Sequence, residues 1–240
     1  MIVPLEWAYL FGSTIFLAVW IVLYALFPAT RKEMLIFSLG IGVLSVCTSY
    51  YWWTHDWWHP LTITGTKVGV EDFIAGFGSG GVMAVVYEGL FKKHYYKRKS
   101  HHHCPGAFTL LLLMALLTSW LFWGVGITSF WASTIALLVI AGVMFYYRRD
   151  LLANGILSGV FMAAFSLLPY FAIMLVSPGW VAATYNYQYL SGFHFIGIPI
   201  EELVFWFLAG LVFGPFYEYW QGEYLRRSQS RKAGMKIRPS

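Results

Sequence analysis

Seven apolar runs decide what this chain can fold into. They lie near residues 7–27, 34–53, 70–91, 107–125, 128–147, 151–176 and 200–220. A run of roughly 20 apolar residues is long enough to cross a bilayer as an α-helix, which satisfies its own backbone hydrogen bonds. The chain is 59% hydrophobic and only 11% charged, a composition that excludes an ordinary soluble domain. We therefore predict an all-α integral membrane protein with seven transmembrane helices.

Basic residues lie almost entirely in alternate loops, those after the first, third, fifth and seventh runs. Of the 16 Lys and Arg residues, only Lys67 lies in the other set of loops. By the positive-inside rule, we predict a multi-pass protein of the cell membrane with its N-terminus outside and its C-terminus in the cytoplasm. The formal charge of +5 therefore orients the chain in a lipid bilayer, and we expect no nucleic acid partner.

Two of the apolar runs match each other at a constant offset of 130 residues. The identical pairs are Glu71/Glu201, Phe77/Phe207, Gly80/Gly210, Val82/Val212, Tyr87/Tyr217 and Glu88/Glu218, and Asp72/Glu202 is a conservative change. Both runs cross the membrane in the same direction. The match therefore predicts two parallel three-helix repeats joined by a linking helix, a 3+1+3 arrangement.

This arrangement divides the chain into four parts. We expect a first repeat with its cytoplasmic loop in residues 1–106, a linking helix in 107–127, a second repeat in 128–225 and a basic cytoplasmic tail in 226–240. Glycines in the third run allow close helix packing. Pro169 and Pro215 are expected to kink the sixth and seventh helices and to open space for a cavity.

Four acidic residues open the two matched helices: Glu71, Asp72, Glu201 and Glu202. One interpretation is capping, because carboxylates at a helix N-terminus interact favourably with free amide groups and the helix dipole. Capping needs one acid, however, and here two adjacent acids occur in both repeats. Ionisable groups within membrane helices are usually functional. We predict that these four residues supply the acid and the base of a proton-transfer reaction.

Aromatic residues crowd the segments before both acidic helices, in residues 50–60 and 185–195. Most of these rings fit an aromatic belt at the membrane interface. Some could instead line a cavity and stabilise a carbocation through their π faces. As candidates for substrate binding we take a set drawn from these segments and from the acidic helices: Trp57, Trp58, Phe73, Phe77, His194, Phe205 and Trp206.

The remaining polar residues suggest no metal or disulfide. His55, His59 and His194 lack the spacing of a recognised metal site, so interfacial hydrogen bonding is expected, and His101–His103 are expected in a solvated loop. Cys47 and Cys104 belong to opposite faces of the membrane and are not expected to pair. We predict no bound metal and no cofactor.

The two acidic motifs resemble those of a known family. Gly69-Val70-Glu71-Asp72-Phe73 and Ile198-Pro199-Ile200-Glu201-Glu202 are similar to the lycopene cyclase domain of bacterial heterodimeric and fungal fused carotenoid cyclases. The second motif matches the Pro-x-Glu-Glu signature of that family. The first motif carries Gly69 and Asp72 in place of the signature's Pro and second Glu. Residues 57–65 also look similar to stretches of bacterial proteins with this domain.

This resemblance implies a cofactor-independent isomerase of carotenoid biosynthesis, a lycopene β-cyclase-like intramolecular lyase. An acid would protonate the terminal double bond of a linear end group, and the cation would close to a six-membered ring. A base would then remove a proton to leave a β-ionone ring, with no net redox change. The implied partners are a lipophilic carotenoid or other isoprenoid and the lipid bilayer, and a homo-oligomer is compatible with the sequence.

Three other functions fit parts of the sequence. A cyclase of another isoprenoid would use the same acids. Small transporters share the 3+1+3 arrangement, but the middle of these helices offers few polar residues to hold a hydrophilic solute. A retinal-binding receptor would need a lysine for a Schiff base, and residues 200–220 contain none.

Overall fold

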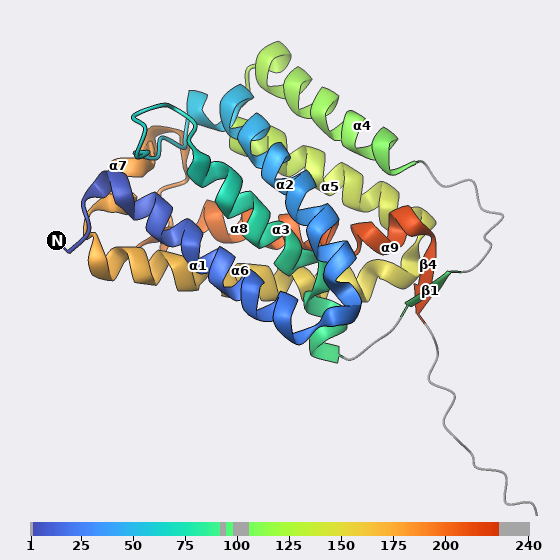
Figure 1. The fold of residues 1–240 in the computed structure, drawn as a ribbon. Helices are drawn as coiled ribbons and strands as arrows, with labels where there is room; N and C mark the ends of the chain where they lie inside the picture. The colour runs from blue at the N-terminus through green and yellow to red at the C-terminus, as the bar shows by residue number, and fades with distance from the viewer. Residues whose placement is uncertain (1, 92–94, 98–105, 226–240) are drawn as a thin grey trace, which may run out of the picture.

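A computed structural model describes residues 2–91, 95–97 and 106–225, and it is a bundle of long helices (Figure 1). Within these residues, 7 helices are long and apolar enough to cross a membrane. They are Leu5–Leu26, Pro28–His55, Val70–Tyr87, Ala107–Val125, Ser129–Tyr147, Arg149–Val176 and Ile200–Gln221. The predicted fold class is confirmed. The orientation of the termini across the membrane stays a prediction, as do the boundaries of the four parts.

The elements follow the apolar runs closely. The α-helices are α1 Leu5–Leu26, α2 Arg31–Tyr51, α3 Val70–Phe91, α4 Ala107–Ser119, α5 Ser129–Tyr147, α6 Leu152–Val176, α7 Trp180–Thr184, α8 Ile200–Phe213 and α9 Phe216–Gln221. A π-helical segment, Trp120–Val125, extends α4. Short 3₁₀ turns lie at Pro28–Thr30, Trp53–His55, Arg149–Leu151 and Tyr187–Tyr189.

Two small antiparallel ribbons were not expected from the sequence. β1 Tyr95–Lys97 pairs with β4 Glu223–Leu225, and β2 His194–Phe195 pairs with β3 Ile198–Pro199. The first ribbon joins the segment after α3 to the segment after α9 at one end of the bundle (Figure 1). The second lies directly before α8, at the opposite end, so it fixes how the chain enters that acidic helix.

Glycines bring each acidic helix into close contact with the preceding membrane-spanning helix. A Cβ atom on Gly76 of α3 would lie 2.8 Å from the Ile41 carbonyl oxygen of α2. A Cβ atom on Gly210 of α8 would lie 2.6 Å from the Ser158 carbonyl oxygen of α6. Side chains cannot be accommodated where two backbones approach this closely, so small residues are required here. The two halves thus share a packing device, while their relation as parallel repeats stays a prediction.

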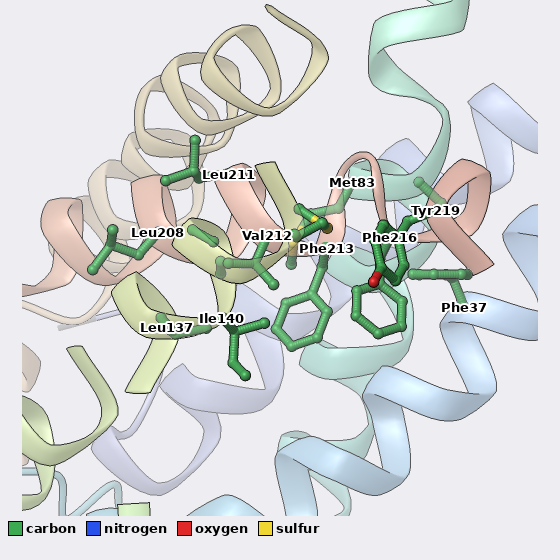
Figure 2. Packing of buried hydrophobic residues seen from close by; sticks show 14 of the residues in the cluster. Phe37, Met83, Leu137, Ile140, Leu208, Leu211, Val212, Phe213, Phe216 and Tyr219 are labelled. Carbon is green, nitrogen blue, oxygen red and sulfur yellow. The ribbon is translucent and has the colours of Figure 1, made fainter. Parts of the chain in front are cut away.

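The two prolines act differently. Pro169 lies buried within α6, and the helix continues to Val176. Pro215 separates α8 from α9, as expected for a residue without a backbone N–H. At this break the Phe213 and Phe216 rings lie side by side, 6.0 Å apart between centroids. Figure 2 shows them within the main hydrophobic cluster, with residues of α2, α3 and α5.

Some sequence predictions concern residues that the structure does not describe and stay predictions. His101–His103, Cys104 and the tail 226–240 lie outside the described ranges. Cys47 is a free, exposed cysteine on α2.

The close α6–α8 contact gives a first prediction. Gly210→Ala places a methyl group against backbone atoms of α6, which cannot move aside, and overpacking of this kind costs about 1–3 kcal/mol. We expect the midpoint of thermal unfolding in detergent, followed by tryptophan fluorescence, to fall by several degrees. Gly142→Ala is the control, because a Cβ at Gly142 meets nothing within 4 Å. Equal midpoints for the two variants would contradict the packing described here.

Candidate active site

The two aromatic loops that precede the acidic helices pair with each other at one end of the bundle. The His59 N–H donates to the Thr184 carbonyl at 2.8 Å, and the Asn186 N–H donates to the Trp57 carbonyl at 3.0 Å. Trp58 and Tyr185 form an isolated β-bridge between these bonds. Segments more than a hundred residues apart in the sequence are thereby fixed against one another.

A buried carboxylate anchors the first loop to the bundle. Asp56 accepts hydrogen bonds from the Ser129 N–H at 2.6 Å and from the Ser129 hydroxyl at 2.5 Å. It also accepts one from the Trp57 N–H at 2.8 Å. Asp56 therefore caps the start of α5 and holds Trp57 inward. This acid was not singled out in the sequence, because its partner lies 73 residues away.

A cavity of about 130 Å³ lies between the helices, below the paired loops. Residues of α2, α3, α4, α5, α6 and α8 line it, with four tryptophans from the first loop. Among the four predicted catalytic acids, only Glu202 lines this cavity. The cavity is therefore an apolar and aromatic chamber that presents one carboxyl group.

Glu202 is buried and surrounded by hydrogen-bond donors. The Trp206 indole N–H donates to the Glu202 Oε2 atom at 3.1 Å. The phenols of Tyr170 and Tyr185 lie against the same carboxyl group and interact with it, and they are hydrogen-bonded to each other at 2.6 Å. Donors placed in this way satisfy the oxygens of a carboxyl group buried in an apolar bundle.

Tyr185 comes from the loop between α7 and β2 and is fully buried beside the cavity. Burial, followed by the charge of the neighbouring Glu202, raises the pKa of the Tyr185 phenol well above its usual value. The phenol therefore keeps its proton at neutral and moderately alkaline pH. It remains available as a hydrogen-bond donor to the acid.

Asp72, the counterpart of Glu202 in the first half, has a different environment. It accepts hydrogen bonds from the Ser49 hydroxyl at 2.7 Å, the Tyr9 phenol at 3.1 Å and the Gly69 N–H at 3.0 Å. The last bond is the return bond of a capping box, in which an acid in the first turn satisfies the backbone N–H just before the helix. Three donors thus hold Asp72 outside the cavity lining.

The residue before each helix explains this difference. Gly69 precedes α3 and has a backbone N–H for Asp72 to accept. Pro199 precedes α8 and has none, so Glu202 cannot form the corresponding bond. Without that bond, the Glu202 side chain faces the cavity and its aromatic donors. The proline of the Pro-x-Glu-Glu signature therefore prevents the second acid from capping its own helix.

The first acid of each pair turns back to its own loop. Glu71 accepts the Ile63 N–H at 2.7 Å, and Glu201 accepts the Ser191 N–H at 2.5 Å. The other carboxyl oxygen of each residue is buried without a hydrogen-bond partner among the described residues. Neither side chain lines the cavity. Both acids instead hold the loop that leads into their helix.

The predicted substrate-binding residues divide into two groups. Trp57, Trp58, Phe205 and Trp206 line the cavity. The other three do not line it. Of these, Phe73 and Phe77 of α3 pack with their rings 5.9 Å apart, Phe77 packs on Trp20 of α1, and His194 is exposed beside the Gly192 carbonyl.

The aromatic segment before α3 also differs from the expected interfacial belt. Tyr50 and Tyr51 are exposed, as a belt requires, whereas Trp52, Trp57 and Trp58 are buried. The inward tryptophans follow from the loop pairing and the Asp56 anchor, which no local pattern reveals.

Two aromatic residues near the acid were missed as candidates. Trp53 lines the cavity, donates to the Ser133 hydroxyl at 3.2 Å and contacts the Phe205 ring edge-on at 4.9 Å. Tyr170 lies directly after Pro169 in an otherwise apolar helix. A phenol at that depth was the available signal, because a buried tyrosine hydroxyl usually has a partner.

In the described ranges, no group of three or more His, Cys, Asp or Glu side chains could hold a metal ion. The chemistry that the site itself offers is proton transfer at Glu202 in an apolar, aromatic chamber.

Comparison with protein families agrees with the acidic motif. A family model described as lycopene cyclase matches residues 128–220, from the start of α5 into α9. Residues 128–220 are therefore similar to the lycopene cyclase family. The resemblance drawn from Pro199, Glu201 and Glu202 is thereby confirmed for this half, and it supports a carotenoid cyclase kind of function. Comparisons with curated proteins and with solved structures gave no match.

The lycopene cyclase match covers all the residues that surround Glu202 from α6, α8 and the intervening loop. It does not include the four tryptophans of the first loop or the acids of α3. The cavity is therefore completed by the half of the chain that lies outside the match.

The turn of Glu71 towards its loop gives a second prediction. A Cβ atom at Gly69 would collide with the Glu71 Oε2 atom. We expect Gly69→Ala to lower the free energy of unfolding by about 1–3 kcal/mol, as overpacking does. Gly106→Ala is a matched control, because Gly106 also precedes a helix and its Cβ would make only an ordinary contact, 3.7 Å from Thr109. If both changes shift the thermal midpoint equally, the tight fit of Glu71 is wrong.

Proposed function

We propose that this protein is a membrane-embedded isomerase that closes a β-ionone-type ring at the end of a linear carotenoid such as lycopene. One observation carries the proposal: the second acid of the family signature, Glu202, is the carboxyl group that faces the aromatic cavity. The family match of residues 128–220 supports the substrate class.

The reaction needs one proton given and one proton taken. Glu202 in its acid form donates a proton to the terminal C=C bond, which leaves a tertiary cation. The π electrons of a second double bond attack this cation, so that a C–C bond forms and a six-membered ring closes with the positive charge on the ring. Loss of a ring proton gives the new C=C bond. Substrate and product are isomers, and no oxidant or reductant takes part.

The aromatic chamber suits the cationic intermediates. The π faces of tryptophan and phenylalanine attract a cation, by about 2 kcal/mol or more where water is excluded. Trp53 and Phe205 meet edge to face at 4.9 Å, and Phe205 and Trp206 lie 5.7 Å apart. These rings lie along the same cavity wall as Glu202. A cation formed next to the acid is therefore stabilised by the rings that surround it.

Glu202 is also the proposed acceptor of the final proton. After the first transfer it is a carboxylate, and the donors Trp206, Tyr170 and Tyr185 stabilise that charge until the ring proton returns. We assign Glu71 and Glu201 to holding the two loops. Asp72 positions Tyr9, whose ring contacts Trp58 in the cavity wall at 5.5 Å.

The cavity lining argues against the transporter alternative. The Ser79 hydroxyl donates to the Ala75 carbonyl and the Thr48 hydroxyl to the Ser45 carbonyl, each within its own helix. Hydroxyl groups satisfied in this way offer little to a hydrophilic solute. A hydrocarbon loses nothing by entering such a chamber. A different linear isoprenoid would use the same acid and the same rings.

The role of Glu202 gives a third prediction. Glu202→Gln keeps the shape of the side chain but cannot donate and regain a carboxyl proton, and loss of general acid–base catalysis costs about 10²- to 10⁴-fold in rate. We expect cells that accumulate lycopene to form monocyclic or bicyclic carotene with the wild-type chain and almost none with Glu202→Gln. Pigments are separated by chromatography and identified by absorption and mass.

Glu201→Gln is the matched control for this experiment. Its amide oxygen can still accept the Ser191 N–H, so the loop and the activity should be retained. Activity in Glu202→Gln, or its loss only in Glu201→Gln, would refute the assignment of the acid. Unchanged lycopene with a folded wild-type chain would refute lycopene as the substrate.

The hydrogen bond from Trp206 gives a fourth prediction. Trp206→Phe preserves an aromatic ring but removes the N–H that donates to Glu202. A hydrogen bond to a charged group contributes about 1.5–3 kcal/mol, so we expect the initial rate to fall about tenfold or more. Phe205→Leu is a useful contrast, because it removes a ring and leaves the hydrogen bonds of Glu202 intact. A Trp206→Phe rate equal to the wild type would show that this donor does not support the acid.

A further inference from the structure

A second hollow lies further along the bundle from the acid. It has a volume of about 440 Å³ and lies between α2, the start of α4 and the α8–α9 break. Its walls include Gly40 and Val43 of α2, Phe108 of α4, and Phe213, Phe216 and Trp220. We call this hollow the α2–α4 groove.

The groove adjoins the cavity that Glu202 lines, because the two hollows share part of their walls. Ile41, Leu44 and Phe213 line both hollows. Glu202 lies in the first turn of α8, whereas Trp220 lies near the end of α9, at the other end of the candidate membrane span Ile200–Gln221. Together the two hollows follow most of the length of the bundle. A long, narrow molecule could therefore reach from the groove to the acid.

The size of the acid cavity requires such an extension. A cavity of roughly 150 Å³ takes up a molecule as large as benzene. The 130 Å³ around Glu202 therefore suits one end group of an isoprenoid and cannot enclose a carotenoid chain. The rest of the substrate must lie elsewhere, and the larger groove is the neighbouring hollow that shares walls with the cavity.

The groove also opens sideways, through the bundle wall that faces the membrane interior. Val43 is 57% exposed and Phe108 is 78% exposed, and Cys47 of α2 is exposed on the same side. Both α2 and α4 are membrane-spanning helices, so this opening faces lipid. A hydrocarbon dissolved in the bilayer could enter here without passing through water.

We propose that the α2–α4 groove is the lateral entrance and binding groove for the polyene chain of the substrate, while its end group occupies the cavity at Glu202. This inference rests on the proposed cyclase function. The lining residues are apolar or aromatic apart from the Cys47 thiol, and they include no Asp, Glu, Lys, Arg or His side chain. The rings of Phe108, Phe213, Phe216 and Trp220 offer flat faces against which a rigid conjugated chain can pack. Phe213 lines both hollows, so a chain in the groove points its end towards the acid. A lipid tail has no need of this alignment, because it has no end group to present to the acid.

A glycine in the groove allows a specific block. Gly40 lines the groove, and a Cβ there meets nothing within 4 Å, so Gly40→Phe starts from open space and adds a ring at the groove wall. Gly142→Phe is the matched control. It makes the same change at an open glycine on α5, which lines neither hollow.

Cys47 supplies a readout that does not depend on catalysis. The chain has two cysteines, so a Cys104→Ser background leaves Cys47 as the single thiol to react. Purified full-length protein in detergent is treated with a lipophilic maleimide, with and without lycopene, and labelling is followed by mass spectrometry. The Glu202→Gln variant is included, since it should bind lycopene without converting it.

We expect lycopene to slow Cys47 labelling about tenfold in the wild-type and Glu202→Gln chains and in Gly142→Phe. Gly40→Phe should abolish this protection and lower the cyclised product about tenfold in lycopene-accumulating cells. If a chain that cyclises lycopene shows no protection, or Gly40→Phe cyclises it at the wild-type rate, the groove assignment is overturned and the cyclase function stands. If lycopene protects Cys47 but no ring forms, the cyclase function fails and the groove stands. Equal protection by a saturated lipid chain would overturn the groove's selectivity for a polyene.

Discussion

Burial of carboxyl groups at one end of an apolar bundle, the four acids of α3 and α8 among them, is the constraint on which the rest of this structure depends. A buried charge without partners is far too costly, so each acid must find hydrogen-bond donors inside the protein. Glu71 and Glu201 obtain them from the backbone of the loops, and Asp72 obtains them from Ser49, Tyr9 and Gly69. The loops must therefore fold inward over the helix ends. In doing so they bring their tryptophans to the cavity.

The two halves solve this problem differently, and the difference assigns the chemistry. In the first half the second acid closes a capping box, since Gly69 provides an N–H. In the second half Pro199 withholds that donor, and Glu202 is left to aromatic donors at the edge of an apolar chamber. Of these four acids, Glu202 is the one that lines the cavity and can therefore meet a bound hydrocarbon. The acid of the first half thus stabilises the start of its helix, and we propose that the acid of the second half takes part in the reaction.

The two hollows fit two parts of the proposed substrate. The chamber at Glu202 fits an end group, and the α2–α4 groove beside it extends towards the far end of the bundle. The helix that borders the groove, α4, packs mainly on α5 and lies at the margin of the bundle in Figure 1. One side of α2 therefore stays open to the α2–α4 groove, which we propose as the lateral entrance.

The sequence by itself determined the seven spanning helices and the acidic motif of the second half, because apolar run length and a local signature are properties of neighbouring residues. Only the tertiary structure decided which acid faces the cavity. Glu71, Asp72, Glu201 and Glu202 look equivalent along the chain, but their partners come from loops and helices distant in sequence. The same holds for Trp53 and Tyr170, which no periodic pattern marks, and for Phe73 and Phe77, which pack on α1 and α2 instead of the cavity. Hydrogen-bond partners and cavity walls arise from contacts between distant segments, so they are fixed only when the bundle closes.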